Sequence, residues 1–598
     1  MQKVQIYSSL ENMINRLVRN PKRSLPVILL LAAAAYSNIF TNAYVMDDFS
    51  TIANWPLIQN PANWPRFFIG FIPPDGAGAV YSPFKTLFHS VIFLLSRGSP
   101  IGFHVAALLV QLAGTYIVYR IVSLLLENEF ISFVAALLFA LHPVHVEGIT
   151  HMAAVTDTLG GVFLFFAFYC YIKAVGYEGS LLVRGSQSGA SAKQNFGGWF
   201  DLVSSADYGR ALLFGFLAIF TNELTLSLPF LLFFYDYFFS RSTRSLRFSF
   251  RRTAPFLLMA LFYLLLKSSV LGGIGGRYLG DSFYLTMMLT IKAWAKYLWI
   301  LFFPVTLTPD HVIADGLFSF NPKDFDSYAV ISQSPLDPQT FISFVILAFL
   351  GAAGWMAWPK QRLISFCVGW FFISLLPAAN LIPNSVYFAE RYLYVASFSF
   401  CLLASYGIYG LYTHERFGSG TFKKSVVVAC VVGLVVFYAA RDLMRNRDWR
   451  DSVAISEAAV RANPQSAFLR NDLGIAYFQQ GELKKAKESF TQAIAMRSNE
   501  PHFYFSAEET YSALEQYDTA ITYLRKAIEL NPQFAEAYFN FSSLLAYLHK
   551  ESESAEYLQR AVELYKQQGR LLEAGQALTA MESYHHLSEK EVLDIIEE

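Results

Sequence analysis

Two adjacent carboxylates are notable for where they lie in the sequence. Asp47 and Asp48, in the stretch YVMDDFSTI (44–52), follow directly on one of the most apolar runs of the chain, PVILLLAAAAYSNIF (26–40). A carboxylate held close to a hydroxyl group can take its proton while the oxygen attacks as a nucleophile. The pair is therefore a candidate for general-base catalysis, and a solvated turn or helix N-cap is the alternative interpretation.

Three further polar groups lie at the ends of apolar runs, where charged side chains are costly and indicate a functional site. They are HPVHVEGITHMAAVTDTLGG (142–161), TNELTL (221–226) and the segment around AER (389–391). The candidate substrate-binding residues that these groups contain are His142, His145, Glu147, Asp157, Glu223, Glu390 and Arg391.

These residue types suit the transfer of a group from a lipid phosphate. An arginine neutralises the charge on a departing phosphate through bidentate hydrogen bonds, and a carboxylate activates or orients the hydroxyl acceptor. If a divalent cation such as Mg²⁺ or Mn²⁺ takes part, Asp47 and Asp48 are its expected ligands. A zinc site at His142 and His145 is disfavoured because Pro143 interrupts the helix that would align them. We expect these histidines to support the site by hydrogen bonding.

The composition identifies a membrane protein. Hydrophobic residues make up 54% of the 598 residues and charged residues 15%, and long apolar runs recur from about residue 26 to about residue 440. Such runs are typical of a polytopic helical membrane protein. The formal net charge is zero, which gives no case for a nucleic-acid partner. The four cysteines all lie in apolar runs and outline no disulfide framework.

About eleven transmembrane helices are expected, from apolar runs near the roughly 20 residues that a bilayer requires. Two other apolar stretches, 82–97 and 284–303, carry polar or helix-breaking residues and are predicted to lie at the membrane surface. The predicted spans are 26–42, 102–122, 129–142, 150–172, 209–222, 224–239, 254–270, 340–358, 362–377, 391–412 and 424–440.

Basic residues orient this bundle, because loops rich in Lys and Arg stay in the cytoplasm. Lys22, Arg23 and the arginine-rich segment 241–252 are assigned to the cytoplasm, which places the four polar groups and the C-terminal region on the outer face. A cluster after the last span opposes this assignment and is expected to face lipid phosphates or the soluble region. The cluster comprises Arg441, Arg445, Arg447 and Arg450.

The C-terminal region is predicted to be a helical repeat. Asn463-Pro464 and Asn531-Pro532 lie 68 residues apart, which is twice the 34-residue period of tetratricopeptide repeats. Such stacks of paired helices bind peptides or extended chains in a concave groove, and a spacer or dimerisation surface is the alternative. The predicted repeats are 467–500, 501–534 and 535–568, with a half repeat at 448–464.

These motifs resemble those of the transmembrane and tetratricopeptide repeat-containing proteins, which are membrane glycosyltransferases of the C-type superfamily. The resemblance covers nearly the whole chain in one order. Its main carriers are VMDD (45–48), YSPF (81–84), LHPVHVEGI (141–149), FAERYLYVAS (388–397) and RNRDW (445–449).

Two positions depart from the family pattern. The family has Gly-Arg-Ala before the acid at Asp157, where this chain has Ala154-Val155-Thr156, and it tends to have Lys where this chain has Asn222. These departures suggest a diverged donor or acceptor.

The resemblance implies an all-α fold, with a polytopic membrane bundle of the C-type glycosyltransferase fold followed by a tetratricopeptide solenoid. It implies transfer of a sugar, typically mannose, from a polyprenyl-phosphate donor to Ser or Thr hydroxyls of proteins, with inversion at the anomeric carbon. Asp47 or Asp48 would be the base, and Arg391 would bind the donor phosphate. The expected domains are a cytoplasmic N-terminus (1–25), the transferase bundle (26–440), a connector (441–466), the repeats (467–568) and a helical cap (569–598).

A non-catalytic membrane scaffold that holds partners through the repeats is the second class of function. The acids favour the enzyme, because a scaffold has no need of Asp47, Glu147 and Arg391 on one face. The expected partners of the enzyme are the lipid donor, a polypeptide acceptor and membrane lipids. The outer face is the periplasm if the protein lies in a bacterial inner membrane, and the lumen if it lies in the endoplasmic reticulum.

Overall fold

The computed structural model describes residues 20–70, 81–175, 205–239, 246–308 except 274, 277, 279 and 280, 337–383, 386–413 and 421–585. Every regular element in these segments is a helix, which confirms the all-α prediction. The described chain forms two compact units that meet in sequence between Ile455 and Ser456. We call them the membrane unit and the repeat unit.

Eight helices of the described membrane unit are long and apolar enough to cross a membrane. A ninth candidate is α6 (Glu129–Leu141), which continues beyond Pro143 into α7 (Val146–Thr150) with a bend of 47°. The eight are α2 (Pro21–Ala35, with the turn that follows), α5 (Pro100–Leu126), α8 (Val155–Val175), α12 (Leu246–Leu271), α13 (Phe283–Phe302), α14 (Pro338–Ala357), α16 (Leu393–Thr413) and α17 (Thr421–Asp448).

The remaining helices of the membrane unit differ from the expected spans. Three predicted spans are α10 (Ala206–Thr221), α11 (Leu228–Phe239) and α15 (Arg362–Ser374), with 16, 12 and 13 residues. These lengths fall short of the roughly 20 residues of a straight span. Helix α4 (Pro83–Ser96) is short, whereas α13, expected at the surface, has the length and apolarity of a span. The apolar bundle is confirmed, and the count of eleven is not.

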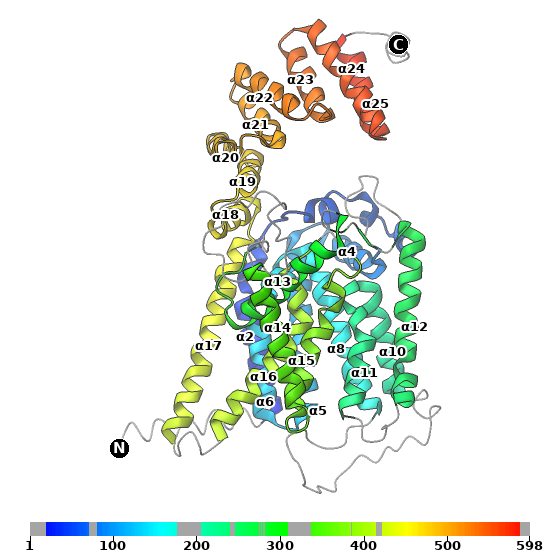
Figure 1. Ribbon diagram of the computed structural model, residues 1–598, viewed down its shortest axis with the longest axis vertical. Coiled ribbons are helices and arrows are strands. Elements are labelled where there is room, and N and C mark those ends of the chain that lie inside the picture. The colour runs from blue at the N-terminus through cyan, green and yellow to red at the C-terminus, as the bar shows by residue number, and fades with distance from the viewer. Residues whose placement is uncertain are drawn as a thin grey trace. The chain divides into compact units, whose positions relative to one another are not determined.

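The core of the membrane unit is packed by aromatic rings against small residues. Figure 1 shows α8, α10, α11 and α12 side by side in this bundle. Tyr394 of α16 is buried, and a Cβ added at Gly161 of α8 would lie 2.8 Å from its ring. Phe139 and Phe165 contact the same ring, with centroids 5.1 and 6.2 Å away. Close packing of this kind is typical of membrane helices, whose small residues let helices approach.

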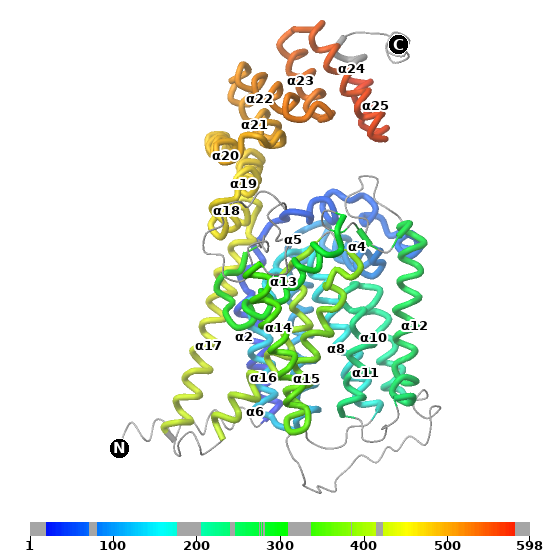
Figure 2. The backbone as a smooth tube through the Cα atoms, in the orientation of Figure 1, coloured from blue at the N-terminus to red at the C-terminus, as the bar shows by residue number. Residues whose placement is uncertain are grey.

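The repeat unit consists of successive antiparallel helix pairs, whose path is traced in Figure 2. Small residues lie buried between the paired helices. A Cβ added at Gly474 would lie 2.7 Å from the Phe490 ring, and Ser554 donates a hydrogen bond to the Ser542 carbonyl at 2.9 Å. The helices are α18 (Ser452–Ala462), α19 (Ala467–Gln479), α20 (Leu483–Met496), α21 (Pro501–Ala513), α22 (Tyr517–Leu530), α23 (Ala535–Tyr547), α24 (Glu551–Gln567) and α25 (Leu571–His585).

The contact between Gly474 and Phe490 gives a test of the repeat packing. Gly474→Ala is expected to destabilise the α19–α20 pair by about 1–3 kcal/mol, because the added methyl group overlaps the fully buried ring. Hydrogen exchange read by mass spectrometry should show faster exchange of amides in both helices. Gly575→Ala in α25 is the matched control, because its Cβ meets open space. Equal protection in the two variants would contradict the packing described.

Candidate functional site

The two adjacent acids occupy different environments. Asp48 is fully buried, and its carboxylate accepts the backbone N–H groups of Val45 at 3.0 Å and Ala153 at 2.7 Å. These bonds close a tight turn in which Met46 adopts the left-handed conformation with φ 50°, a costly geometry for a side chain of this kind. The side chain of Asp47 is 56% exposed. Asp48 therefore shapes the loop, and Asp47 presents its carboxylate to solvent.

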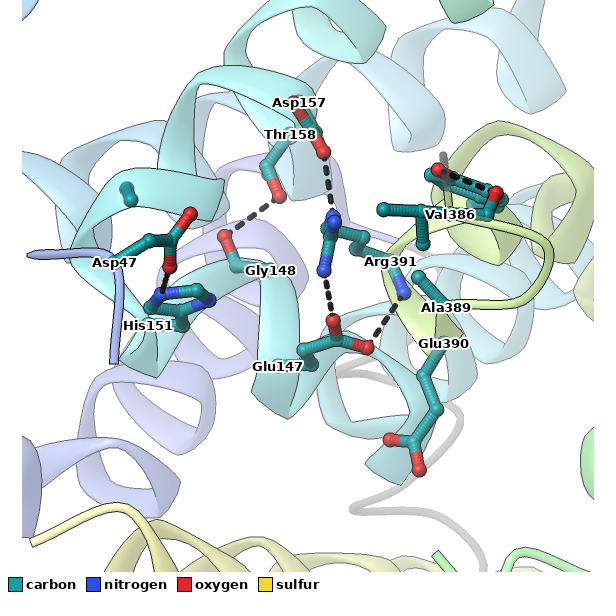
Figure 3. A network of polar contacts seen from close by, with 12 residues as sticks. Asp47, Glu147, Gly148, His151, Asp157, Thr158, Val386, Ala389, Glu390 and Arg391 are labelled. Carbon is teal, nitrogen blue, oxygen red and sulfur yellow. Dashed lines mark hydrogen bonds and ion pairs between the residues drawn. The ribbon is translucent and has the colours of Figure 1, made fainter. Parts of the chain in front are cut away.

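Asp47 is paired with His151, which follows α7. Oδ1 of Asp47 lies 2.7 Å from Nε2 of His151, and the imidazole ring stacks on the Trp449 indole at 5.1 Å between centroids (Figure 3 shows the Asp47–His151 pair). Burial opposes ionisation of Asp47, but His151 outweighs it and holds the pKa of Asp47 well below its usual range. Burial likewise opposes the charged imidazole, but the carboxylates of Asp48 and Asp47 raise the pKa of His151. Each partner therefore favours the charged form of the other.

Arg391 lies between two carboxylates from a different part of the chain. Its Nε donates to Asp157 at 2.8 Å, its Nη1 pairs with Glu147, and its backbone N–H donates to Glu147 at 3.2 Å (Figure 3). Glu147 comes from α7, which exists because Pro143 breaks the preceding helix, and Asp157 comes from the first turn of α8. The two carboxylates thus orient the Arg391 guanidinium. Ion pairs that are largely buried stabilise a protein only when their geometry is good.

The third polar group joins this cluster through its asparagine. Asn222 donates to the free carboxylate oxygen of Asp157 at 2.5 Å. The neighbouring Glu223 forms an ion pair with Lys267 of α12 at 2.6 Å. Asn222 therefore has a structural role, because its amide side chain satisfies Asp157. The lysine that pairs with Glu223 comes from a helix distant in the sequence.

Three candidate residues have their polar atoms directed elsewhere. Glu390 is fully buried and points away from its neighbour Arg391, toward Arg445 of α17. His142 and His145 are also buried. Their rings bond to the carbonyl of Leu301 at 3.0 Å and the hydroxyl of Ser397 at 2.8 Å. All three were candidate substrate-binding residues, and the two histidines were expected to support the site by hydrogen bonding. Burial and these bonds direct the polar atoms of all three into the protein.

Four residues outside the set of candidate site residues belong to this site: His151, Lys85, Arg445 and Lys267. Lys85, in the first turn of α4, contributes a positive charge that helps to hold down the pKa of Asp47, after the larger effect of His151. It directly follows the YSPF motif, which is the signal that identifies it. Arg445 belongs to the arginine cluster that opposed the predicted orientation. Its side chain is only 1% exposed because it pairs with Glu390 at 2.7 Å.

The described residues offer no group of three or more His, Cys, Asp or Glu side chains arranged to hold a metal ion. The two acids considered as ligands are already engaged. Both oxygens of Asp48 accept backbone N–H groups, and Asp47 is paired with His151. A divalent cation at Asp47 and Asp48 therefore does not fit this geometry, and no step is assigned to one.

Comparison with known proteins agrees with both units. Models of the tetratricopeptide repeat match residues 439–501 and 504–534. The mouse protein O-mannosyl-transferase TMTC3 (Mus musculus) is 23% identical over 91% of this chain and 60% of its own length. The Drosophila melanogaster Tmtc3 protein is 24% identical over 90% of this chain and 64% of its own. Human TMTC2 (Homo sapiens) is 22% identical over 78% and 62%. The chain spans about 60% of the length of these relatives.

An apolar helical bundle with a polar cluster, joined to helical repeats, defines a multi-pass membrane protein that carries tetratricopeptide repeats. Its relatives align with it across both parts. The chain is similar, across both parts, to the transmembrane and tetratricopeptide repeat-containing proteins.

The Asp47–His151 pair predicts a pH dependence of stability. Because the pKa of His151 is raised on folding, its contribution is complete below its unfolded pKa of about 6.5 and is lost as the pH rises through the folded value. The contribution of Asp47, whose pKa is lowered, is lost only in acid. Thermal unfolding in detergent should therefore show the largest deficit of His151→Gln near pH 5–6, shrinking toward pH 9.

His142→Gln is the control for this measurement, because His142 contacts the Leu301 carbonyl instead of a carboxylate. Because burial lowers the pKa of His142, its deficit should run in the opposite direction and shrink as the pH falls toward 5. A deficit of His151→Gln that did not change with pH would show that the imidazole carries no charge in the folded protein.

Proposed function

We propose that this protein is a glycosyltransferase that moves mannose or another hexose from a polyprenyl-phosphate donor to a Ser or Thr hydroxyl of a protein. The observation that carries the proposal is the exposed carboxylate of Asp47, held by His151 beside the Glu147–Arg391–Asp157 cluster. A base and a fixed guanidinium are the two groups that glycosyl transfer from a phosphate requires. The printed names of the relatives, protein O-mannosyl-transferases, support the same reaction.

The base in this proposal is Asp47. Its oxygen takes the hydroxyl proton as the acceptor oxygen bonds to the anomeric carbon, and the bond from that carbon to the phosphate oxygen breaks. The electron pair leaves with the lipid phosphate, and attack opposite the leaving group inverts the anomeric centre. Because the pKa of Asp47 is low, proton transfer becomes favourable only late, when bond formation has made the hydroxyl acidic. The paired His151 keeps the carboxylate ionised and oriented.

Arg391 is proposed to bind the donor phosphate through Nη2, since the two carboxylates engage Nε and Nη1. Even with Asp48 left aside, the acids Asp47, Glu147 and Asp157 outnumber the cations Arg391 and His151. An anionic phosphate therefore needs a further positive charge. Lys85 is the proposed source of this charge, because its positive charge acts on the Asp47 carboxylate. We assign Lys85 to the donor phosphate with Arg391.

The repeat unit is proposed to present the polypeptide acceptor, because tetratricopeptide stacks bind extended chains. The reaction is assigned to the outer face, meaning the periplasm of a bacterial inner membrane or the lumen of the endoplasmic reticulum. The alternative, a scaffold without catalysis, is disfavoured by the exposed Asp47, whose carboxylate has no structural hydrogen bond like those of Asp48.

Asp47→Asn tests the base. It is expected to lower kcat by about 10²–10⁴-fold in transfer from radiolabelled polyprenyl-phosphate-mannose to an acceptor peptide, because the amide cannot take the proton. The fold should persist, since Asp47 is exposed. Asp207→Asn is the control, because Asp207 pairs with Lys173 and Arg210, away from the cluster. Full activity of Asp47→Asn in correctly inserted protein would overturn the assignment.

Lys85→Met tests the phosphate contact. Loss of a hydrogen bond to a charged group costs about 1.5–3 kcal/mol, so KM for the lipid donor should rise about ten- to hundredfold. The KM for the acceptor should not change, and Lys85→Arg should keep most of the affinity because the charge is retained. A rise in the acceptor KM instead of the donor KM would place Lys85 on the other substrate.

A further inference from the structure

We propose that residues 445–449, at the end of α17, form a clamp that positions the reacting groups, with Trp449 setting the ring of His151 and thereby Asp47. This inference rests on the proposed function for the reaction that the clamp serves. The segment is the RNRDW motif. The ion pairs among Asp47, His151, Glu147, Arg391 and Asp157 do not involve it. Its contacts reach each of the three chain segments that carry Asp47, His151 and Arg391.

The first contact is with the segment that leads to Asp47. Asn446 donates to the Ala35 carbonyl at 3.1 Å and to the Asn38 side chain at 2.8 Å, and its own carbonyl accepts from Asn42 at 2.9 Å. The backbone N–H of Ala43 donates to the Arg450 carbonyl at 2.8 Å. These bonds end four residues before Asp47. They fix where the loop leaves α2.

The second contact is with the turn that carries His151. Thr150 donates to the side-chain oxygen of Asn446 at 3.0 Å, so this fully buried asparagine ties the turn to the loop before Asp47. The adjacent His151 then lies with its ring 24° from the plane of the Trp449 indole. Trp449 is 1% exposed, so the indole is a buried wall against which the imidazole is held. A charged imidazole on an indole face is also an electrostatically favourable pair.

The third contact is with the turn that carries Arg391. Arg445 donates to Glu390 at 2.7 Å, and the other oxygen of Glu390 accepts the backbone N–H of Thr308 at 3.0 Å. Both charges are almost fully buried, and breaking such a pair is strongly destabilising because it leaves one charge uncompensated. The pair therefore fixes the backbone of Glu390. The next residue is Arg391.

The clamp acts through other groups, so its residues are positioning residues. A misplacement of about 1 Å from a site remote from the chemistry can cost about a hundredfold in rate. Removing the Trp449 ring frees one face of the His151 imidazole. The Asp47 carboxylate, which pairs with His151, then loses its fixed orientation. The proposed donor contacts at Arg391 and Lys85 remain. The expected effect is a loss of kcat of about ten- to hundredfold with an unchanged donor KM.

The test compares Trp449→Ala, Trp449→Leu and Trp449→Phe in the full-length protein with Tyr438→Ala. Tyr438 is a matched control, because it is a buried aromatic residue of α17 whose ring contacts another histidine, His142, at 4.9 Å. Leu keeps most of the buried volume without an aromatic face, and Phe keeps a smaller face. The first readout is kcat and donor KM. The second is acylation of individual histidines by diethyl pyrocarbonate, mapped by mass spectrometry. The reagent attacks the neutral imidazole, so labelling is compared across a pH series, and this readout needs no turnover.

The clamp is supported if Trp449→Ala and Trp449→Leu lower kcat and raise His151 labelling severalfold, Trp449→Phe restores both, and Tyr438→Ala exposes His142 instead. It is overturned if His151 labelling stays at the wild-type level in Trp449→Leu, or if Tyr438→Ala exposes His151 equally. If the wild-type protein shows no transfer while the labelling follows the expected pattern, the proposed function fails and the positioning of His151 by Trp449 stands.

Discussion

The structure of the polar cluster depends on the ion pairs of Arg391 with Glu147 and Asp157. A guanidinium at the end of an apolar bundle is expensive to bury, and its two carboxylates offset that cost only if all three groups keep their geometry. The break at Pro143, the short helix α7 and the first turn of α8 are arranged so that both carboxylates reach one arginine. Asn222 then satisfies the second oxygen of Asp157, and the clamp at the end of α17 holds the turns that carry His151 and Arg391.

The same reasoning explains why two neighbouring acids have unlike roles. A carboxylate that accepts two backbone N–H groups inside the fold is a structural element, and Asp48 is such a group. It holds the strained turn at Met46, and that turn directs Asp47 outward to His151. A catalytic base must be both accessible and fixed. The buried Asp48 fixes the loop, and the exposed Asp47 is accessible to a substrate.

Much of the fold followed from the sequence because its determinants are local or periodic. The apolar runs predicted the membrane helices, and the 34-residue period predicted the helix pairs of the repeat unit. Local pattern also selected Asp47, Glu147, Asp157 and Arg391. The pairings could not be read in the same way, because Arg391 and Glu147 are 244 residues apart. Adjacency in sequence even misled: Glu390 and Arg391 are neighbours, yet a 3₁₀ turn directs them to different partners.

The arginine cluster at the end of α17 shows where a sequence rule stops applying. The positive-inside rule counts basic residues in loops, where each carries an uncompensated charge past the membrane. Arg445 does not meet that condition, because its charge is buried against Glu390 and is neutralised within the fold. Arg445 should therefore be left out when the basic residues of this loop are counted. The orientation derived from the N-terminus and the 241–252 segment then faces one opposing charge fewer. The buried Arg445–Glu390 pair thus removes one of the arginines that argued against the predicted orientation. The same pair holds the turn that carries Arg391.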